Sequence, residues 1–179
     1  AVIALINHVG SVNLEVEVNK WADSSVPRVI FTNTLNLISE FKIFIRLLSE
    51  SLRLRKKAKH ESNKTNCKFL KYASYEALLG ASRDTLRISA QVEKLVCCLN
   101  PKKIIVTYEG MAWERVVFSS ARSVNPNIEC IGYQFGALLR LQHSIRRNLD
   151  RKYNPDRIFT SGKISKSQLQ ISPGLNGIP

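Results

Sequence analysis

Apolar residues recur at three- and four-residue steps in several parts of the chain, which is the spacing of one face of an α-helix. The first such stretch covers residues 37–59 and contains Leu37, Ile38, Phe41, Phe44, Ile45, Leu48 and Leu52. The end of this helix, in the segment RLRKKAKHESNKTN, loses the apolar face and becomes polar. This pattern predicts one long helix with a single apolar face.

Three further helices are predicted from the same spacing. A second long helix is expected from about Ser74 to Leu99, and Asn100-Pro101 ends it because proline disfavours helical backbone in the residue before it. A third is expected over residues 111–124, and a short last helix near Ile164 to Leu169. The second long helix has an apolar stripe of Ile88, Val92, Leu95 and Leu99, and the third has Trp113, Val116, Val117, Ser120 and Val124 at helical spacing.

Short apolar runs between these helices predict β-strands. The run KIIVT at 103–107 is typical of a buried parallel strand. The other expected strands are Val2 to Ile6, Arg28 to Phe31, Ile128 to Tyr133 and Arg157 to Thr160. Strands that alternate with helices predict an α/β fold in which a parallel sheet carries helices on both faces.

Composition fits a soluble globular protein. The chain has 179 residues, 44% of them hydrophobic, and a mean hydropathy of −0.11. It has no apolar run near 18 residues, which argues against a transmembrane helix. The four cysteines lack CxxC spacing and are expected to be reduced, which indicates the cytoplasm. The chain begins without methionine and ends in SPGLNGIP, a run of turn formers, so we expect it to be a fragment.

Positive charge is concentrated in two segments. The net charge is +13, from 27 Lys or Arg and 14 Asp or Glu. Residues 35–71 hold ten Lys or Arg and three Glu, and residues 135–166 hold eight Lys or Arg and two Asp. Such a distribution suits a polyanion, a nucleotide-linked substrate or an anionic membrane surface, and charge alone does not choose among them.

Several common chemistries lack their motifs. The sequence has no GxGxxG, no GxSxG and no DxD pair, and Gly162-Lys163 lacks the upstream glycine of a phosphate-binding loop. The histidines, His8, His60 and His143, are far apart, and no cluster has metal-ligand spacing. We therefore expect no metal and no cofactor.

The ends of three predicted strands carry the remaining motifs: YEG at 108–110, GYQFG at 132–136 and PDRIFTSGK at 155–163. In this order and spacing they resemble bacterial surface-carbohydrate biosynthesis proteins, whose fold is that of glycosyltransferases with two Rossmann-like domains. Family members show an EG(x)AWE-like corner, then GYQHG, then PDRI(x)(x)SG. The resemblance covers roughly residues 104–165.

The resemblance implies a Rossmann-like N-terminal, acceptor-side domain over residues 1–170, followed by the start of a linker at 171–179. A second Rossmann-like domain, which usually holds most of the sugar nucleotide, would come after Pro179. Phe135 stands where the family usually has histidine, so a contact made by that imidazole would be lost or relocated. The site positions carried over are Tyr108, Glu109, Gly110, Trp113, Glu114, Tyr133, Gln134, Gly136, Ser161, Gly162 and Lys163.

Several of these positions also have a purely structural interpretation. Glu109 is either a catalytic base or a turn residue that caps the next helix, where the helix dipole favours a carboxylate. Gln134 supplies a donor and an acceptor to a hydroxyl-rich ligand or bonds a neighbouring loop. Trp113 is more typical of core than of a sugar platform, and Glu114 of a surface charge. Gly136 and Gly162 mark tight turns.

The leading hypothesis is a metal-independent glycosyltransferase of surface-polysaccharide or O-antigen biosynthesis, with Glu109 as catalytic base. Its partners would be a sugar-nucleotide donor, a glycan or lipid-linked acceptor, the second domain and an anionic membrane surface. The protein would then be cytoplasmic and peripheral to the inner membrane. The alternative is a non-catalytic basic α/β module that binds nucleic acid or another polyanion. Nucleic acid is the less favoured partner because aromatic residues are scarce in the basic segments.

Overall fold

The computed structural model describes residues 1–6, 16, 19, 23, 25–32, 34–138, 144–175 and 178. Predictions for His8 and His143 fall outside the described residues. The chain forms two compact units, Ala1–Ile88 and Ser89–Pro179. The expectation of a single domain over residues 1–170 stays a prediction.

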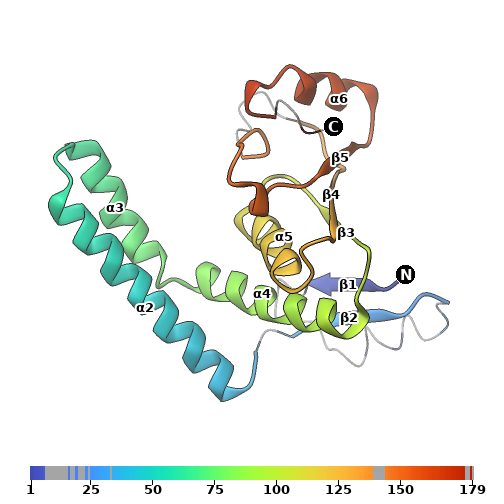
Figure 1. Cartoon of the computed structure of the whole chain (residues 1–179), viewed down its shortest axis with the longest axis horizontal. Coiled ribbons are helices and arrows are strands. Elements are labelled where there is room, and N and C mark those ends of the chain that lie inside the picture. The colour runs from blue at the N-terminus through green and yellow to red at the C-terminus, as the bar shows by residue number, and fades with distance from the viewer. Residues whose placement is uncertain are drawn as a thin grey trace. The chain divides into compact units, whose positions relative to one another are not determined.

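The first unit contains a small parallel sheet and a helical hairpin (Figure 1). Strands β1 (Ile3–Ile6) and β2 (Arg28–Phe31) pair in parallel, with Ile3 opposite Arg28. Helix α2 (Leu37–His60) begins after Asn36, whose side chain accepts a hydrogen bond from the Ser39 amide at 2.8 Å. Helix α3 (Lys64–Glu76) begins in the same way after Asn63. Asparagine is favoured at these positions because its side chain satisfies amides that have no partner within the helix.

The predicted helix from Ser74 to Leu99 is wrong in its first part. The chain instead ends α3 at Glu76 and starts α4 (Gly80–Leu99) after a turn. The amides of Leu78 and Leu79 bond carbonyls three residues back, which tightens the last turn of α3. The hydroxyl of Ser82 then donates to the Glu76 carbonyl at 2.8 Å. These local hydrogen bonds divide the predicted helix into α3 and α4, although the apolar spacing continues across the break.

Small residues hold α2 and α3 together. Ser51, Ala58 and Ser74 are buried at their contact. The Ser51 hydroxyl donates to the Ser74 carbonyl at 2.7 Å, and the Cys67 thiol donates to the Ala58 carbonyl at 3.2 Å. The apolar residues of α2 that the sequence places on one face are mostly exposed, so this face is not part of the core.

The second unit is built on a three-stranded parallel sheet. Its order is β3 (Lys103–Thr107), β4 (Glu129–Gln134) and β5 (Arg157–Thr160). Helix α5 (Ala112–Val124) connects β3 to β4, and α6 (Lys163–Gln170) follows β5. Short 3₁₀ turns occur at Arg151–Tyr153 (η1) and Pro173–Leu175 (η2). The prediction that these three strands lie parallel and adjacent is confirmed.

The core of this unit lies between α5 and one face of the sheet. Phe118 and Tyr108 are fully buried and their rings lie 5.7 Å apart, centroid to centroid. The Tyr108 ring covers Gly132, where a Cβ would crowd it. The buried positions of α5 are Glu114, Arg115, Val117, Phe118, Ser120 and Ala121, so the buried face is rotated from the predicted stripe.

The mixed α/β class with parallel strands is therefore confirmed. The strands form two small sheets rather than one, and on the three-stranded sheet Ile105, Tyr133 and Phe159 are exposed. These three residues share one face because side chains of neighbouring parallel strands in register point to the same side.

Candidate functional site

The register of the second sheet brings the three sequence motifs to one edge. Thr107 lies opposite Tyr133, and Gln134 lies opposite Thr160. Beyond the ladder, the Tyr108 amide donates to the Tyr133 carbonyl at 2.8 Å, and the Ser161 amide donates to the Gln134 carbonyl at 3.0 Å. The corners YEG, GYQFG and TSGK are thus neighbours at the carboxyl ends of the strands, which is where ligands bind in open parallel sheets.

The first corner depends on Gly110. Its φ is +82°, a conformation that favours glycine. A Cβ at this position would overlap the backbone of Ser144 and Ile145, which passes directly against the corner. By contrast, Gly162 lies in a bend but has extended backbone and open space where a Cβ would lie, so this position does not require glycine.

Glu114 closes the first corner from the start of α5. Its carboxylate accepts hydrogen bonds from the Glu109 amide at 2.9 Å and from the Met111 amide at 2.8 Å. The side chain is buried, which contradicts the expected surface charge. Burial raises the pKa of Glu114, and the backbone amides oppose that rise. The cap of α5 is therefore provided by Glu114 and not by Glu109.

Arg115 was not identified from the sequence, yet it organises the wall beside this corner. It is only 4% exposed and donates to the carbonyls of Gly110, Ser144 and Arg147 and to the Asn154 side chain, at 2.8 to 3.2 Å. Its guanidinium also lies 5.5 Å from the centre of the Tyr108 ring. A sequence signal for this burial exists. Glu114 is three and four residues before the apolar Val117 and Phe118, and Ala121 continues the same face, so Glu114 and the adjacent Arg115 could have been predicted to be buried.

A second arginine of α5 fixes the chain that leads into β5. Arg122 donates to the carbonyls of Arg151, Lys152 and Asn154, and it pairs with Asp156 at 2.9 Å. Asp156 in turn accepts the Cys130 amide at 2.8 Å. The aspartate of the PDRI motif therefore has a structural role at the beginning of the sheet.

Glu109 keeps its side chain available. Its amide bonds Glu114 and its carbonyl accepts the Ser144 hydroxyl at 2.8 Å, so the backbone is fixed. The half-buried carboxylate lies against the second corner, with Oε1 only 3.3 Å from where a Cβ on Gly136 would be. Residues from two motifs thus meet, and the absence of a side chain at Gly136 leaves room for the carboxylate.

Two buried polar atoms at the same sheet edge have no hydrogen-bond partner among the residues that the structure describes. They are the Tyr108 hydroxyl and the side-chain oxygen of Gln134. Tyr108 is fully buried and Gln134 is 1% exposed, while the Gln134 amide nitrogen donates to the Gly136 carbonyl. Burial raises the pKa of Tyr108 to about 12, against the opposing effect of Arg115. Unpaired buried polar groups are costly, so most buried polar atoms of folded proteins have a partner.

The remaining predicted positions are more open. Tyr133 is 41% exposed and stacks with Phe135, at 6.5 Å between ring centroids. Trp113 is half-buried, whereas Ser161, Gly162 and Lys163 are exposed. The structure therefore brings Tyr108, Glu109, Gln134 and Gly136 together and places the third motif beside them through the Ser161 amide.

Within the described ranges, no group of three His, Cys, Asp or Glu side chains could hold a metal ion. None of the described helices is both long and apolar enough to cross a membrane. The fold and the site together define an α/β protein that has a polar corner at the carboxyl edge of a parallel sheet. No protein-family model, curated protein or solved structure matches this chain.

Proposed function

We propose that the chain is the acceptor-side half of a glycosyltransferase of bacterial surface-polysaccharide biosynthesis, with Rossmann-like architecture and a second domain after Pro179. The observation that carries the proposal is the contact between the first two motifs, where the Glu109 carboxylate lies against Gly136. A carboxylate that is half-buried, and whose own backbone is fixed on both sides, suits a base that must be held in position.

In the proposed reaction, an acceptor hydroxyl attacks the anomeric carbon of an activated sugar. The new carbon–oxygen bond forms as the bond to the nucleotide phosphate breaks, and the phosphate leaves with the electron pair. Glu109 takes the proton of the hydroxyl. The side-chain oxygen of Gln134, which has no partner among the described residues, would orient a hydroxyl of the acceptor.

The third motif would serve the donor. Lys163 is exposed at the first turn of α6, directly after Ser161-Gly162. A positive side chain and the amides of a helix N-terminus both favour phosphate. This arrangement would balance the negative charge of the donor phosphates without a metal ion bound by a DxD motif.

The test uses the full-length enzyme and follows nucleotide release from a panel of uridine-, guanosine- and cytidine-linked sugars. Glu109→Gln keeps the shape but removes the basicity, so kcat should fall by roughly 10²–10⁴ while circular dichroism stays unchanged. Glu93→Gln, an exposed carboxylate on α4, is the matched control and should transfer at the normal rate. Wild-type turnover in Glu109→Gln would reduce Glu109 to a turn residue and refute its assignment as base.

A further inference from the structure

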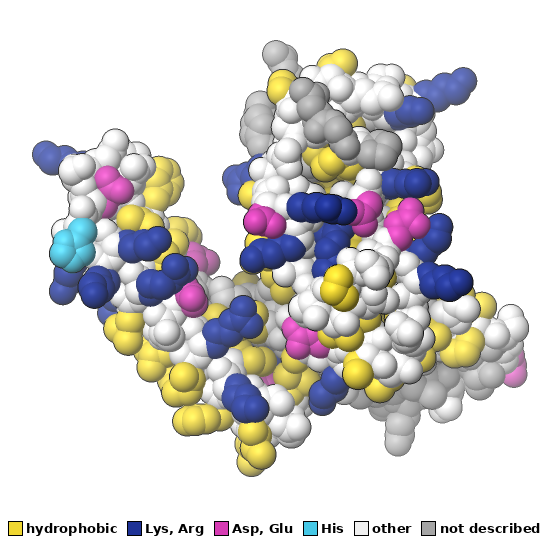
Figure 2. All heavy atoms as spheres, viewed as in Figure 1, with side chains coloured by type: hydrophobic (Ala, Val, Ile, Leu, Met, Phe, Trp, Pro, Cys, Tyr) yellow, Lys and Arg dark blue, Asp and Glu magenta, His cyan; other side chains and the backbone are white. Residues whose placement is uncertain are grey.

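The N-terminal part of α2 carries an apolar row that the other described residues of its unit leave exposed. Leu37 is 88% exposed, Ile38 71% and Phe41 64%. Phe44, Ile45 and Leu52 continue this row at helical spacing and are also exposed. Figure 2 shows hydrophobic side chains along this helix with Lys and Arg side chains beside them. Contiguous exposed apolar surface of this kind marks an interaction site.

Basic residues continue the same line toward the end of the helix. Arg55 and Lys59 follow Leu48 and Leu52 at steps of three and four residues, and both are exposed. The Arg55 guanidinium lies 5.1 Å from the centre of the Tyr75 ring, which places the exposed side of α3 next to it. Lys64, Lys68 and Lys71 precede Tyr75 at the same helical spacing and are exposed too.

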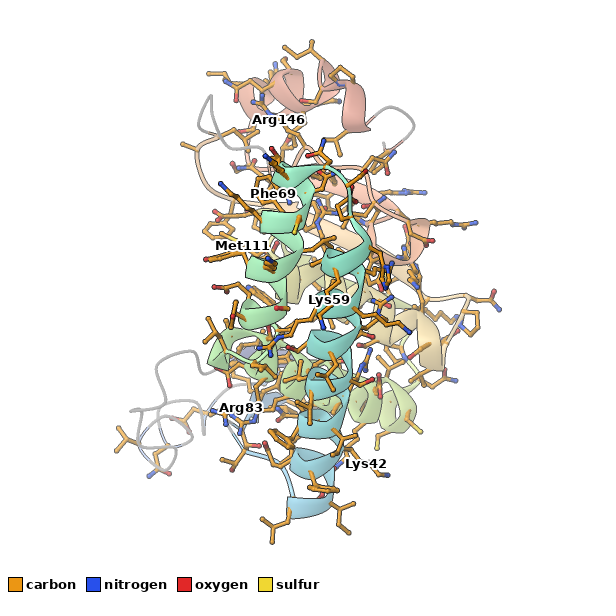
Figure 3. The ribbon with its side chains drawn as sticks, turned by 90° about the vertical axis from the view of Figure 1, so that its left-hand side faces the viewer. Lys42, Lys59, Phe69, Arg83, Met111 and Arg146 are labelled. Atoms are coloured by element: carbon orange, nitrogen blue, oxygen red, sulfur yellow. The ribbon has the colours of Figure 1, made fainter. Side chains whose placement is uncertain are left out.

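Figure 3 shows α2 and α3 side by side, with Lys42 and Lys59 on α2 and Phe69 on α3. We define the hairpin face as the exposed surface formed by the apolar and basic residues of α2 and the lysines of α3. Its apolar half consists of Leu37, Ile38, Phe41, Phe44, Ile45 and Leu52, and its basic half of Arg55, Lys56, Lys59, Lys64, Lys68 and Lys71.

The hairpin segment 37–76 holds four Glu, at positions 40, 50, 61 and 76, against ten Lys or Arg. Glu40 is bound by Arg87 of α4 at 2.7 Å, and Glu50 by Arg53 at 2.6 Å. The hydrogen bond between Ser51 and Ser74 holds the two helices in one arrangement, so the hairpin face is preformed. An apolar row joined to a cluster of cations is complementary to a surface that has both an apolar phase and negative charge.

We propose that the hairpin face binds in the plane of an anionic lipid bilayer. The apolar half enters the boundary between headgroups and acyl chains, and the basic half binds anionic headgroups. A 24-residue helix is about 36 Å long, so α2 offers an extended contact along the surface. A soluble polyanion would match only the basic half and would leave the phenylalanines in water. The proposal is independent of the transferase function.

The first experiment measures flotation of the chain with vesicles of phosphatidylcholine that contain 30 mol% phosphatidylglycerol. Binding should be strong at 0.05 M salt and fall at least tenfold by 0.5 M, because the screening length is already about 8 Å at 0.15 M. Vesicles of phosphatidylcholine alone should bind at least tenfold more weakly. Equal binding to both vesicle types, or binding to neither, would overturn the proposal.

The second experiment separates the two halves of the hairpin face. Phe41→Ser with Phe44→Ser should weaken vesicle binding at least tenfold, since both rings leave the apolar phase. Lys56→Gln with Lys59→Gln should weaken it about fivefold per lysine removed. The matched controls are Ile164→Ser with Ile171→Ser and Lys94→Gln with Lys166→Gln, all at exposed positions outside the hairpin. These controls should bind as the unmodified chain does.

The third experiment tests insertion itself. Phe41→Trp should give a fluorescence blue shift with anionic vesicles that the unmodified chain lacks, and brominated acyl chains should quench it. If the double serine variant binds anionic vesicles with normal affinity, charge alone accounts for binding and the proposed apolar contact does not form. If sedimentation shows a dimer that the double serine variant abolishes, the hairpin face binds a second copy of the chain, and the proposal of bilayer binding is wrong.

Discussion

Gly110 illustrates how a motif residue can be required for folding rather than for chemistry. Its positive φ and the backbone of Ser144 and Ile145 leave no space for a side chain. Glu114 is similar, because its carboxylate is used by the amides of the corner. At this edge the Glu109 carboxylate is half-buried and lies against Gly136, while the Gln134 oxygen and the Tyr108 hydroxyl are buried without a hydrogen-bond partner among the described residues.

Gly110→Ala should lower the free energy of unfolding by about 3 kcal/mol or more. The left-handed conformation costs a non-glycine residue about 1–2 kcal/mol, and overlap with packed backbone adds about 1–3 kcal/mol. Urea denaturation measures the change. Gly80→Ala is the control, because a Cβ at the start of α4 meets nothing within 4 Å. It should be neutral or stabilising by up to about 1 kcal/mol, and equal losses in both variants would contradict the argument.

At the scale of elements, α5 does more than connect two strands. Its two buried-side arginines, Arg115 and Arg122, bind carbonyl oxygens of the connection that runs from Ser144 to Asn154. That connection has little secondary structure of its own apart from η1. Its position against the first corner therefore depends on side chains of the helix, and the geometry around Glu109 depends on the same side chains through Ser144.

Arg115→Lys should loosen this connection. A lysine cannot reach four separate oxygens with one ammonium group, so buried carbonyls lose their donors, at a cost of about 2–4 kcal/mol. Hydrogen exchange should speed up over residues 144–154 while the amides of the α2–α3 hairpin keep their protection.

The control for this change is Arg151→Lys, since that side chain is exposed and the contact with Arg122 uses its backbone. The control should leave both stability and exchange unchanged. Normal exchange over residues 144–154 in Arg115→Lys would mean that the connection is held by other contacts.

At the scale of the whole molecule, two acidic groups of the sheet core make stability sensitive to alkali. Burial raises the pKa of Cys130 from 9.0 to about 11 and that of Tyr108 from 10.0 to about 12. The folded chain therefore keeps protons that the unfolded chain releases from pH 9 upward. Its stability must fall as pH rises through this range.

The free energy of unfolding should decrease by roughly 2–3 kcal/mol for each of the two groups between about pH 9 and pH 12. Denaturant titrations at a series of pH values measure this slope. The double variant Cys130→Ala with Tyr108→Phe cannot release these protons, so its stability should change much less over the same range. If the double variant lost stability with pH as steeply as the unmodified chain, groups other than Cys130 and Tyr108 would cause the sensitivity to alkali.

Local pattern was sufficient for most elements of this protein. The strands at 28–31, 103–107 and 157–160 and the helix from Leu37 were predicted because spacing and capping are properties of neighbouring residues. The break before Gly80 was missed because apolar spacing continues across it, although a glycine at that point is a poor helix former. The start of α3 was missed too, although Asn63 is a favoured capping residue. The edge position of the three motifs was also predictable, since parallel strands bring their carboxyl ends together.

By itself, then, the sequence determined which residues share a strand or a helix face and which motifs meet at the sheet edge. Tertiary structure alone decided what lies opposite each face. It buried Glu114 and Arg115. Glu114 has partners in the adjacent corner, the amides of Glu109 and Met111, whereas Arg115 reaches the carbonyls of Ser144 and Arg147 only because residues 144–154 pack against α5. Within the described part of the first unit, tertiary structure also left the apolar row of α2 exposed, because α3 packs on the small residues Ser51 and Ala58 instead. Periodicity fixes the direction of a side chain, but its partner comes from chain segments distant in sequence.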